Sequence, residues 1–166
     1  APTVCETEML SYVQKRLRIL SGFYGVVRPM DGVSPYRLEM QAKLEIDSAK
    51  NLYEYWGDRL YKEVRDSSGI IINLASKEYS KCIEKYLQPG DRYISCNFFE
   101  EQEGKLVQKG VYCKMARGEM VRFMAEKRVE EPEGIKDFAV MGYQYAKELS
   151  SEKEYIFVRS KEPDEA

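Results

Sequence analysis

Residues 18–40 are the stretch that most restricts how this chain of 166 residues can fold. Glycine, proline, arginine, tyrosine and carboxylate residues follow one another there without the period of a helix or of a strand. Three glycines permit backbone angles that turn amide N–H groups toward an anion: Gly22, Gly25 and Gly32. The stretch therefore predicts an irregular loop that is a candidate for ligand binding.

Two arginines in this loop, Arg28 and Arg37, carry planar guanidinium groups that suit phosphate or carboxylate oxygens. A structural explanation has about equal weight, because the same arginines could form ion pairs with Asp31 and Glu39. The sequence leaves both interpretations open.

Histidine is absent from the whole sequence, which excludes Ser-His and Cys-His nucleophile pairs and histidine metal sites. The cysteines are too widely spaced for a zinc knuckle or a dithiol redox motif: Cys5, Cys82, Cys96 and Cys113. We expect reduced, mostly buried thiols, no metal site and no cofactor.

The net charge is −2 and a third of the residues are charged, so a uniformly basic nucleic-acid coat is excluded while a local basic cleft is permitted. No apolar run approaches the length of a membrane-spanning helix, and no signal segment opens the sequence. We expect a cytoplasmic protein that has no membrane contact.

Hydrophobic periodicity and turn residues predict five helical and six extended segments. The expected helices cover residues 5–17, 47–64, 77–87, 114–128 and a short turn at 132–138. The expected strands cover residues 41–46, 70–74, 142–145 and 155–159, and an antiparallel hairpin covers 92–100 and 105–112.

These elements indicate an α/β (α+β mixed) fold with a mixed sheet, several helices and an antiparallel hairpin. The length suits a single domain over residues 1–166, and we expect the charged residues 160–166 to form a frayed tail.

Two further groups of polar residues are candidates for the site. The expected strand at 70–74 leads into a helix, which places Asn73, Ser76, Glu78 and Tyr79 where α/β ligands commonly bind, although Ser76 also suits a plain helix cap. On the later helix, Lys114 and Arg117 precede Gly118, whose place inside a helix predicts a close neighbour or ligand. Solvated helix cations are a comparable explanation.

Five separated motifs closely resemble the YaaA family of bacterial peroxide stress proteins. They follow the family's order and are Leu20–Asp31, Pro35–Met40, Trp56–Asp58, Ile72–Tyr79 and Lys114–Gly118. The resemblance covers nearly the whole chain. Family members carry an additional N-terminal segment, so the chain resembles the C-terminal two-thirds of the family's usual polypeptide, a YaaA-like domain that is incomplete at its N-terminus.

The resemblance implies a cytoplasmic DNA-binding protein of the peroxide stress response, which protects DNA and limits damage linked to intracellular iron. It also implies an unusual α/β fold with a positively charged cleft and a helix-hairpin-helix-like element. We assign that element to the segment from the first helix through residues 21–25, because glycine-rich hairpins donate N–H groups to phosphates without reading sequence.

Two main functions follow from these residues. In the first, duplex or branched DNA is bound without sequence preference through Ser21, Gly22, Gly25, Arg28, Arg37, Lys114 and Arg117. In the second, the same cleft is an enzyme site for a nucleotide-like or phosphorylated ligand. Its candidate catalytic residues are Asp31, Tyr36 and Glu39, and its supporting polar residues are Tyr24, Asn73, Ser76, Glu78 and Tyr79. A third possibility, direct iron binding, would have to use carboxylates and tyrosines.

Overall fold

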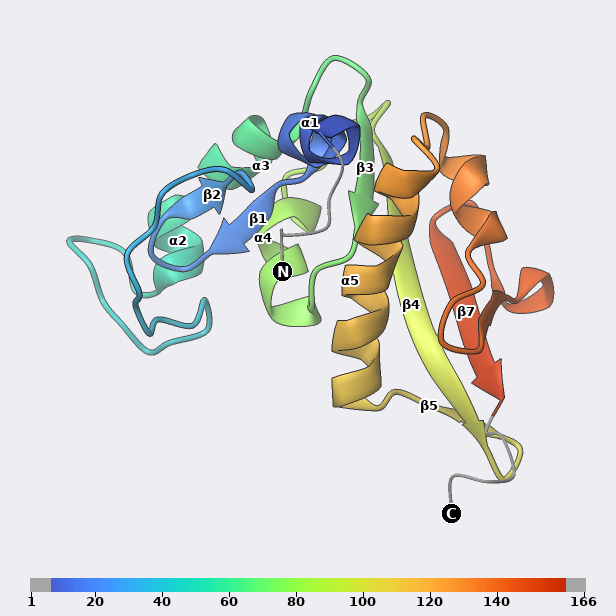
Figure 1. The fold of residues 1–166 in the computed structure, drawn as a ribbon. Coiled ribbons are helices and arrows are strands. Elements are labelled where there is room, and N and C mark those ends of the chain that lie inside the picture. Colours follow the sequence, from blue (N-terminus) through green and yellow to red (C-terminus); the bar gives the residue numbers. More distant parts are fainter. Residues whose placement is uncertain (1–6, 161–166) are drawn as a thin grey trace. The chain divides into compact units, whose positions relative to one another are not determined.

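The computed structural model describes residues 7–160. The expected helix start at Cys5 and residues 161–166 of the expected frayed tail lie outside the described residues. The fold is mixed α/β, as the sequence predicts: a five-stranded mixed sheet, a two-stranded antiparallel sheet and several helices form one domain (Figure 1). The residues group into two compact units, each described separately below.

The first unit, here called the sheet unit, comprises residues 7–12, 72–74 and 94–160 of the described chain and holds most of the five-stranded sheet. The strand order is β3-β4-β7-β6, and β5 pairs with β4. The strands are β3 (Ile70–Asn73), β4 (Arg92–Gln102), β5 (Lys105–Val107), β6 (Tyr143–Tyr145) and β7 (Glu154–Ser160).

The sheet is mixed because its long strands are parallel while its short strands are antiparallel to their neighbours. β4 and β7 run parallel from the pair Ser95–Glu154 to the pair Glu101–Ser160, whereas β5 and β6 pair antiparallel. The hairpin predicted at 92–112 is confirmed. Its second strand is shorter than expected, since the helix α5 (Gly110–Glu126) already begins at Gly110.

The helix α5 lies alongside β4 (Figure 1), and its apolar side faces the core. Ala116 and Met120 are fully buried, while Phe123 and Met124 pack against the same cluster. Phe98 of β4 is at the centre, with its ring 5.3 Å from that of Phe157. Burial of each such large side chain stabilises the fold by about 2–3 kcal/mol. Two short 3-10 helices complete the unit: η2 (Pro132–Asp137) and η3 (Lys147–Leu149).

The second unit, here called the glycine-loop unit, comprises residues 13–71 and 75–93. The helix α1 (Thr7–Arg16) leads into a small antiparallel sheet of β1 (Ile19–Ser21) and β2 (Gly25–Val27). The later helices are α2 (Leu52–Trp56), α3 (Arg59–Val64) and α4 (Lys77–Glu84). Its buried core consists of Met40, Leu52, Leu60, Tyr61, Ile71, Cys82 and Ile83.

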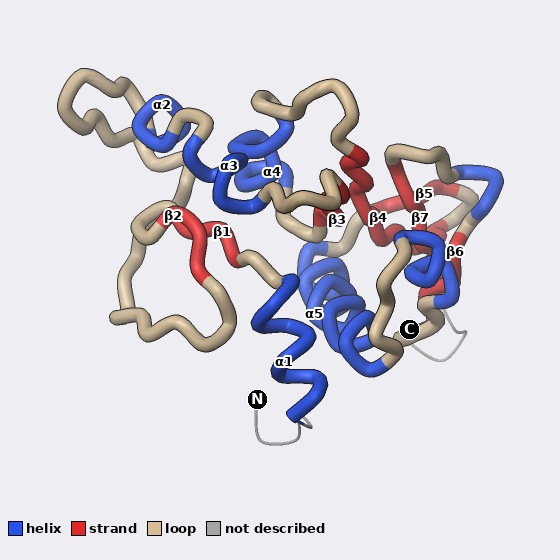
Figure 2. Tube along the Cα trace, turned by 90° about the horizontal axis from the view of Figure 1, so that it is seen from above, coloured by secondary structure: helices blue, strands red, loops and turns tan. Residues whose placement is uncertain are grey.

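Two expectations about residues 28–64 are wrong. Figure 2 shows the chain between β2 and α2 as a long loop, and residues 41–46 hold only an isolated bridge between Ile46 and Ala49. The single helix expected at 47–64 is two short helices, because the backbone at Gly57 has a φ of 54° that an α-helix cannot contain. Asn51, whose side chain accepts the Glu54 N–H at 2.9 Å, caps the first of them.

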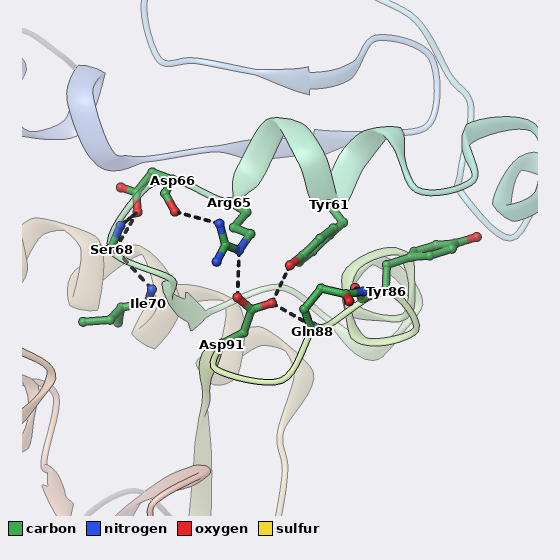
Figure 3. Close-up of polar contacts among 8 residues, drawn as sticks. All are labelled: Tyr61, Arg65, Asp66, Ser68, Ile70, Tyr86, Gln88 and Asp91. Atoms are coloured by element: carbon green, nitrogen blue, oxygen red, sulfur yellow. Dashed lines mark hydrogen bonds and ion pairs between the residues drawn. The ribbon is translucent and has the colours of Figure 1, made fainter.

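A polar network around Asp91 joins α3 to the turn before β4 (Figure 3). The Asp91 carboxylate accepts hydrogen bonds from the Tyr61 hydroxyl at 2.5 Å, from the Gln88 N–H at 2.9 Å and from Arg65 Nε at 2.8 Å. These bonds hold the pKa of Asp91 far below its ordinary value, at about 2, with the Tyr61 hydroxyl as the largest cause. The network holds the C-terminal end of α3 against the turn before β4, within the glycine-loop unit.

Within residues 7–160, every helix is too short or too polar to cross a bilayer.

Candidate functional site

The turn between β1 and β2 is organised by the hydroxyl of Ser21, which is 4% exposed. Ser21 Oγ accepts the backbone N–H groups of Phe23, at 3.3 Å, and Tyr24, at 2.9 Å. It also forms a hydrogen bond with the hydroxyl of Tyr36 from the following loop. Ser21 therefore fixes the glycine-rich turn and ties it to the motif at 35–40.

Two glycines of this turn are required by close packing. A Cβ atom at Gly22 would lie 2.8 Å from the carbonyl oxygen of Leu38, and one at Gly25, whose φ is +80°, would lie 2.9 Å from the Trp56 ring. Trp56 Nε1 also donates a hydrogen bond to the Gly22 carbonyl oxygen at 3.0 Å. Three of the five sequence motifs thus meet at these glycines.

The arginines of the loop are exposed and do not pair with the carboxylates proposed as structural partners. Asp31 accepts the backbone N–H of Arg28 at 2.7 Å, so its carboxylate closes its own turn. Within the described residues, no ion pair or hydrogen bond engages the guanidinium group of Arg28 or Arg37. Both groups are therefore free to meet an external anion.

The fourth motif reaches the same loop from the start of α4. Glu78 accepts the Gln41 N–H at 3.2 Å through its carboxylate and the Tyr53 hydroxyl at 2.8 Å through its carbonyl. Burial raises the pKa of Tyr79, and the charge of Glu78 adds to the effect, with smaller contributions from Tyr36 and Glu39. Two hydrogen bonds, from the Gln41 N–H and the Tyr53 hydroxyl, thus connect the start of α4 to the loop and to α2.

Ser76 occupies the N-cap position of α4, as predicted for a plain cap, but its hydroxyl makes no capping hydrogen bond. The carbonyl oxygen of Ser76 accepts the N–H groups of Tyr79 and Ser80 at 3.0 and 2.9 Å. Tyr24 also has a defined place, since its hydroxyl accepts the Ser34 N–H at 2.9 Å.

The remaining predicted residues belong to the sheet unit. Asn73 donates to Ser95 Oγ at 3.1 Å and so links β3 to β4. Lys114 is exposed on α5, and Arg117 is half-buried beside Cys113, where its charge opposes the rise that burial gives the pKa of that thiol. Within the described chain, no ion pair holds Lys114 or Arg117.

One of the two explanations expected for Gly118, a close protein neighbour, is wrong within the described structure. A Cβ atom there would meet none of its atoms within 4 Å, so no protein neighbour requires the glycine. The other explanation, a ligand beside Lys114 and Arg117, stays a prediction.

The segment assigned to a helix-hairpin-helix-like element is α1 followed by the β1–β2 hairpin. The chain does not enter another helix until Leu52. Any phosphate contact by residues 21–25 would therefore come from a β-turn.

A buried polar cluster in the sheet unit was not predicted from the sequence. Glu100 of β4 is 2% exposed, and its carboxylate lies 2.9 Å from Lys109 Nζ and 3.9 Å from Arg159 Nε. Arg159 stacks over the ring of Tyr112 at 4.3 Å. This Glu100 cluster (Glu100, Lys109, Tyr112 and Arg159) lies near the carboxyl ends of the parallel strands β4 and β7, where α/β sheets commonly bind ligands.

The signal for Glu100 was present in the strand pattern. Inward positions of β4 alternate with period two, through Ile94, Cys96 and Phe98, and Glu100 is the next member of the series. A carboxylate at an inward position needs a buried cation. Its partner Arg159 could not be named, because only the pairing of β4 with β7 brings the two together.

Two hollows of about 600 and 500 Å³ lie elsewhere. The larger is lined by residues around 123–137 of the sheet unit, and the smaller by residues 41–53 of the glycine-loop unit. Neither is lined by the candidate catalytic residues Asp31, Tyr36 and Glu39. Within the described residues, no group of carboxylates and cysteines is arranged to hold a metal ion.

Comparison with known proteins supplies the family. The family model described as peroxide stress protein YaaA matches residues 1–149. A UPF0246 protein of Agathobacter rectalis is 64% identical over 96% of this chain, and one of Desulfitobacterium hafniense is 54% identical over 96%. A third, from Ligilactobacillus salivarius, is 47% identical over 96%.

The chain spans 64% of the length of each of these three relatives. The resemblance stated from the five motifs is confirmed, and the chain belongs to the YaaA (UPF0246) family of peroxide stress proteins.

Proposed function

We propose that this chain binds DNA through backbone phosphates and thereby protects DNA in the cytoplasm during peroxide stress. The observation that carries the proposal is the state of Arg28 and Arg37. Their guanidinium groups are exposed and unpaired within the described residues, on a loop that Ser21, Gly22 and Trp56 hold in place. Exposed, unpaired guanidinium groups offer a planar fork of donors that matches phosphate oxygens.

Lys114 and Arg117 are the second cationic group of the proposal, and they belong to the other unit. We propose that Lys114 and Arg117 also contact backbone phosphates of DNA, as a separate cationic group of the sheet unit. The net charge of −2 means that attraction has to be local and not general.

The test measures affinity for a duplex of arbitrary sequence as a function of salt. The double variant R28A/R37A should bind more weakly, and the slope of log affinity against log salt should fall in magnitude by about 2, since each phosphate contact contributes about 0.9. The matched control is K62A/R122A, which removes the same charge from side chains already paired with Asp58 and Glu126. Equal behaviour of the two double variants would refute the proposal.

A second candidate function is an enzyme acting on a nucleotide-like or phosphorylated ligand, proposed from Glu78, which binds the Gln41 N–H and the Tyr53 hydroxyl beside the loop. In this version Arg37 holds the phosphate, and Glu39 or Asp31 moves a proton. A thermal-shift screen with inorganic phosphate, nucleoside monophosphates and nucleoside triphosphates tests it. Stabilisation that R37A abolishes would support it, and the absence of any shift would count against it.

A further inference from the structure

Three aromatic rings of the glycine-loop unit contact one another at the surface. The Phe23 and Tyr24 centroids are 4.9 Å apart, Phe23 and Tyr36 are 5.4 Å apart, and Tyr24 and Tyr36 are 5.5 Å apart. Phe23 is 57% exposed and Tyr36 is 43% exposed. We call this group the aromatic trio. Most of the Phe23 ring is in water, where it contributes little to the fold.

Hydrogen bonds hold the trio in place. The Tyr36 hydroxyl bonds to Ser21 Oγ, and the Tyr24 hydroxyl is fixed by the N–H and the carbonyl oxygen of Ser34. The backbone of Phe23 is held by Ser21 as well. The exposed rings are therefore presented by a rigid turn, which reduces the entropy that a ligand would have to remove.

The charged residues of the same loop indicate which ligand the trio suits. Arg37 follows Tyr36 directly in the chain, and Arg28 lies in the same loop, both exposed and without an ion pair within the described residues. An apolar protein partner would leave these guanidinium groups without a counterion. An unpaired nucleotide satisfies both features, because its base stacks on a ring while its phosphate meets an arginine.

We propose that the aromatic trio is a stacking site for unpaired nucleobases, so that the chain favours DNA with single-stranded stretches over intact duplex. Phe23 is the ring that meets the base, since it is the most exposed of the three and has no hydroxyl to be held. The inference rests on the proposed DNA-binding function, and it adds a site and a form of DNA to it.

The experiment uses the 166-residue chain with a fluorescent single-stranded oligonucleotide and a duplex of equal length, at one salt concentration. The wild-type chain should bind the single strand more tightly. The variant F23A should lose about 5-fold to 100-fold in affinity for the single strand, the range expected for one stacked base, and should stay within about twofold of wild type on the duplex.

Two further variants separate stacking from apolar contact. F23W keeps an aromatic face and should retain the affinity, whereas F23L keeps apolar bulk and should behave as F23A does. An oligonucleotide that contains 2-aminopurine gives a direct signal, because stacking on a ring quenches its fluorescence. Quenching should occur with wild type and F23W and be lost with F23A and F23L. Thermal unfolding of each variant confirms that it is folded.

The experiments distinguish failure of the stacking site from failure of the proposed DNA-binding function. If R28A/R37A weakens duplex binding while F23A leaves single-strand affinity and quenching unchanged, the stacking site is refuted and the proposed function stands. If neither form of DNA is bound, the proposed function fails and the stacking site with it. If F23L binds as wild type does, or if F23A only dissolves a dimer of the chain, the trio is an apolar interface and the inference is wrong.

Discussion

The indole N–H of Trp56 donates a hydrogen bond to the carbonyl oxygen of Gly22 at 3.0 Å, which joins α2 to the turn between β1 and β2. The two residues are far apart in the sequence and belong to different motifs. Their contact explains why glycine, tryptophan and the 35–40 segment occur together. The backbone of the 35–40 segment packs where a side chain at Gly22 would lie, and the Trp56 indole binds the Gly22 carbonyl oxygen. The arginines of the loop are presented by this arrangement.

The first prediction concerns the tight packing at Gly22. The variant G22A should lower the free energy of unfolding by about 1–3 kcal/mol, because its Cβ would meet the backbone oxygen of Leu38 and the overpacked turn would have to shift. Urea denaturation measures the change. G32A is the matched control, since a Cβ at Gly32 meets nothing within 4 Å in the described structure and should change stability little. Equal stability of the two variants would contradict the close approach.

The second prediction concerns Gly118, which has room for a side chain. G118A should raise the free energy of unfolding by about 1 kcal/mol, the difference between alanine and glycine inside a helix. Chemical denaturation gives the stability, and the salt-dependent DNA assay gives the function. A variant that gains stability but loses affinity for DNA would show that a ligand needs the space; a loss of stability would contradict the open position.

The third prediction concerns the pH dependence that Asp91 confers. Its pKa in the folded chain is about 2, below its ordinary value of 3.8, so its contribution to stability is complete above the unfolded pKa and is lost as the pH falls from about 4 to 2. The free energy of unfolding of wild type should fall over that range. D91N should be less stable at neutral pH and should show a flatter dependence. If the free energies of unfolding of wild type and D91N changed in parallel with pH, Asp91 would not be the source of the pH dependence.

The fourth prediction concerns the thiols. Burial raises the pKa of Cys82 to about 11 and that of Cys96 to about 12, and it raises the pKa of Cys113 as well. Thiolates are the reactive form, so these cysteines should resist both Ellman's reagent and hydrogen peroxide in the native state. The measurement uses a C5S background, with urea-unfolded protein as the positive control. Rapid native labelling would contradict their burial.

The fifth prediction concerns the Glu100 cluster. E100Q should lower the free energy of unfolding by about 3 kcal/mol, because it removes a buried negative charge that faces the Arg159 guanidinium, which is 8% exposed. K109M should have a smaller effect, since Lys109 is 37% exposed and reaches water. The double variant E100Q/R159M should recover part of the loss. If E100Q proved no worse than K109M, the buried charge would not be important for stability.

The secondary structure that the sequence predicts well has strong local signals. The β-branched run of β3, the apolar side of α5 and the alternating strands β6 and β7 all occur near their expected positions. The failures occur where local signals compete. Residues 47–64 have helical periodicity, but the positive φ at Gly57 divides the helix. Among residues 7–160, the segment 41–46 pairs with no strand and forms only the bridge between Ile46 and Ala49.

The candidate site was predicted unevenly for a similar reason. The glycine-rich stretch contains the candidate residues Ser21, Tyr24 and Tyr36. In the structure, Ser21 and Tyr36 bond to each other and the Tyr24 hydroxyl bonds to Ser34. Their stacking with Phe23 could not be foreseen, since it requires the turn at 21–25 and the loop at 34–36 to meet.

The sequence by itself determined the family, the class of fold and the loop that carries the exposed arginines, because these depend on residue types and on their order along the chain. Only the tertiary structure decided which side chains meet. The ion pair of Glu100 with Arg159, the hydrogen bond of Trp56 to Gly22 and the ring contact of Phe23 with Tyr36 each join segments that are separated in the sequence. Local periodicity specifies which face of an element is buried, but the partner of that face is chosen by packing and register across the whole chain.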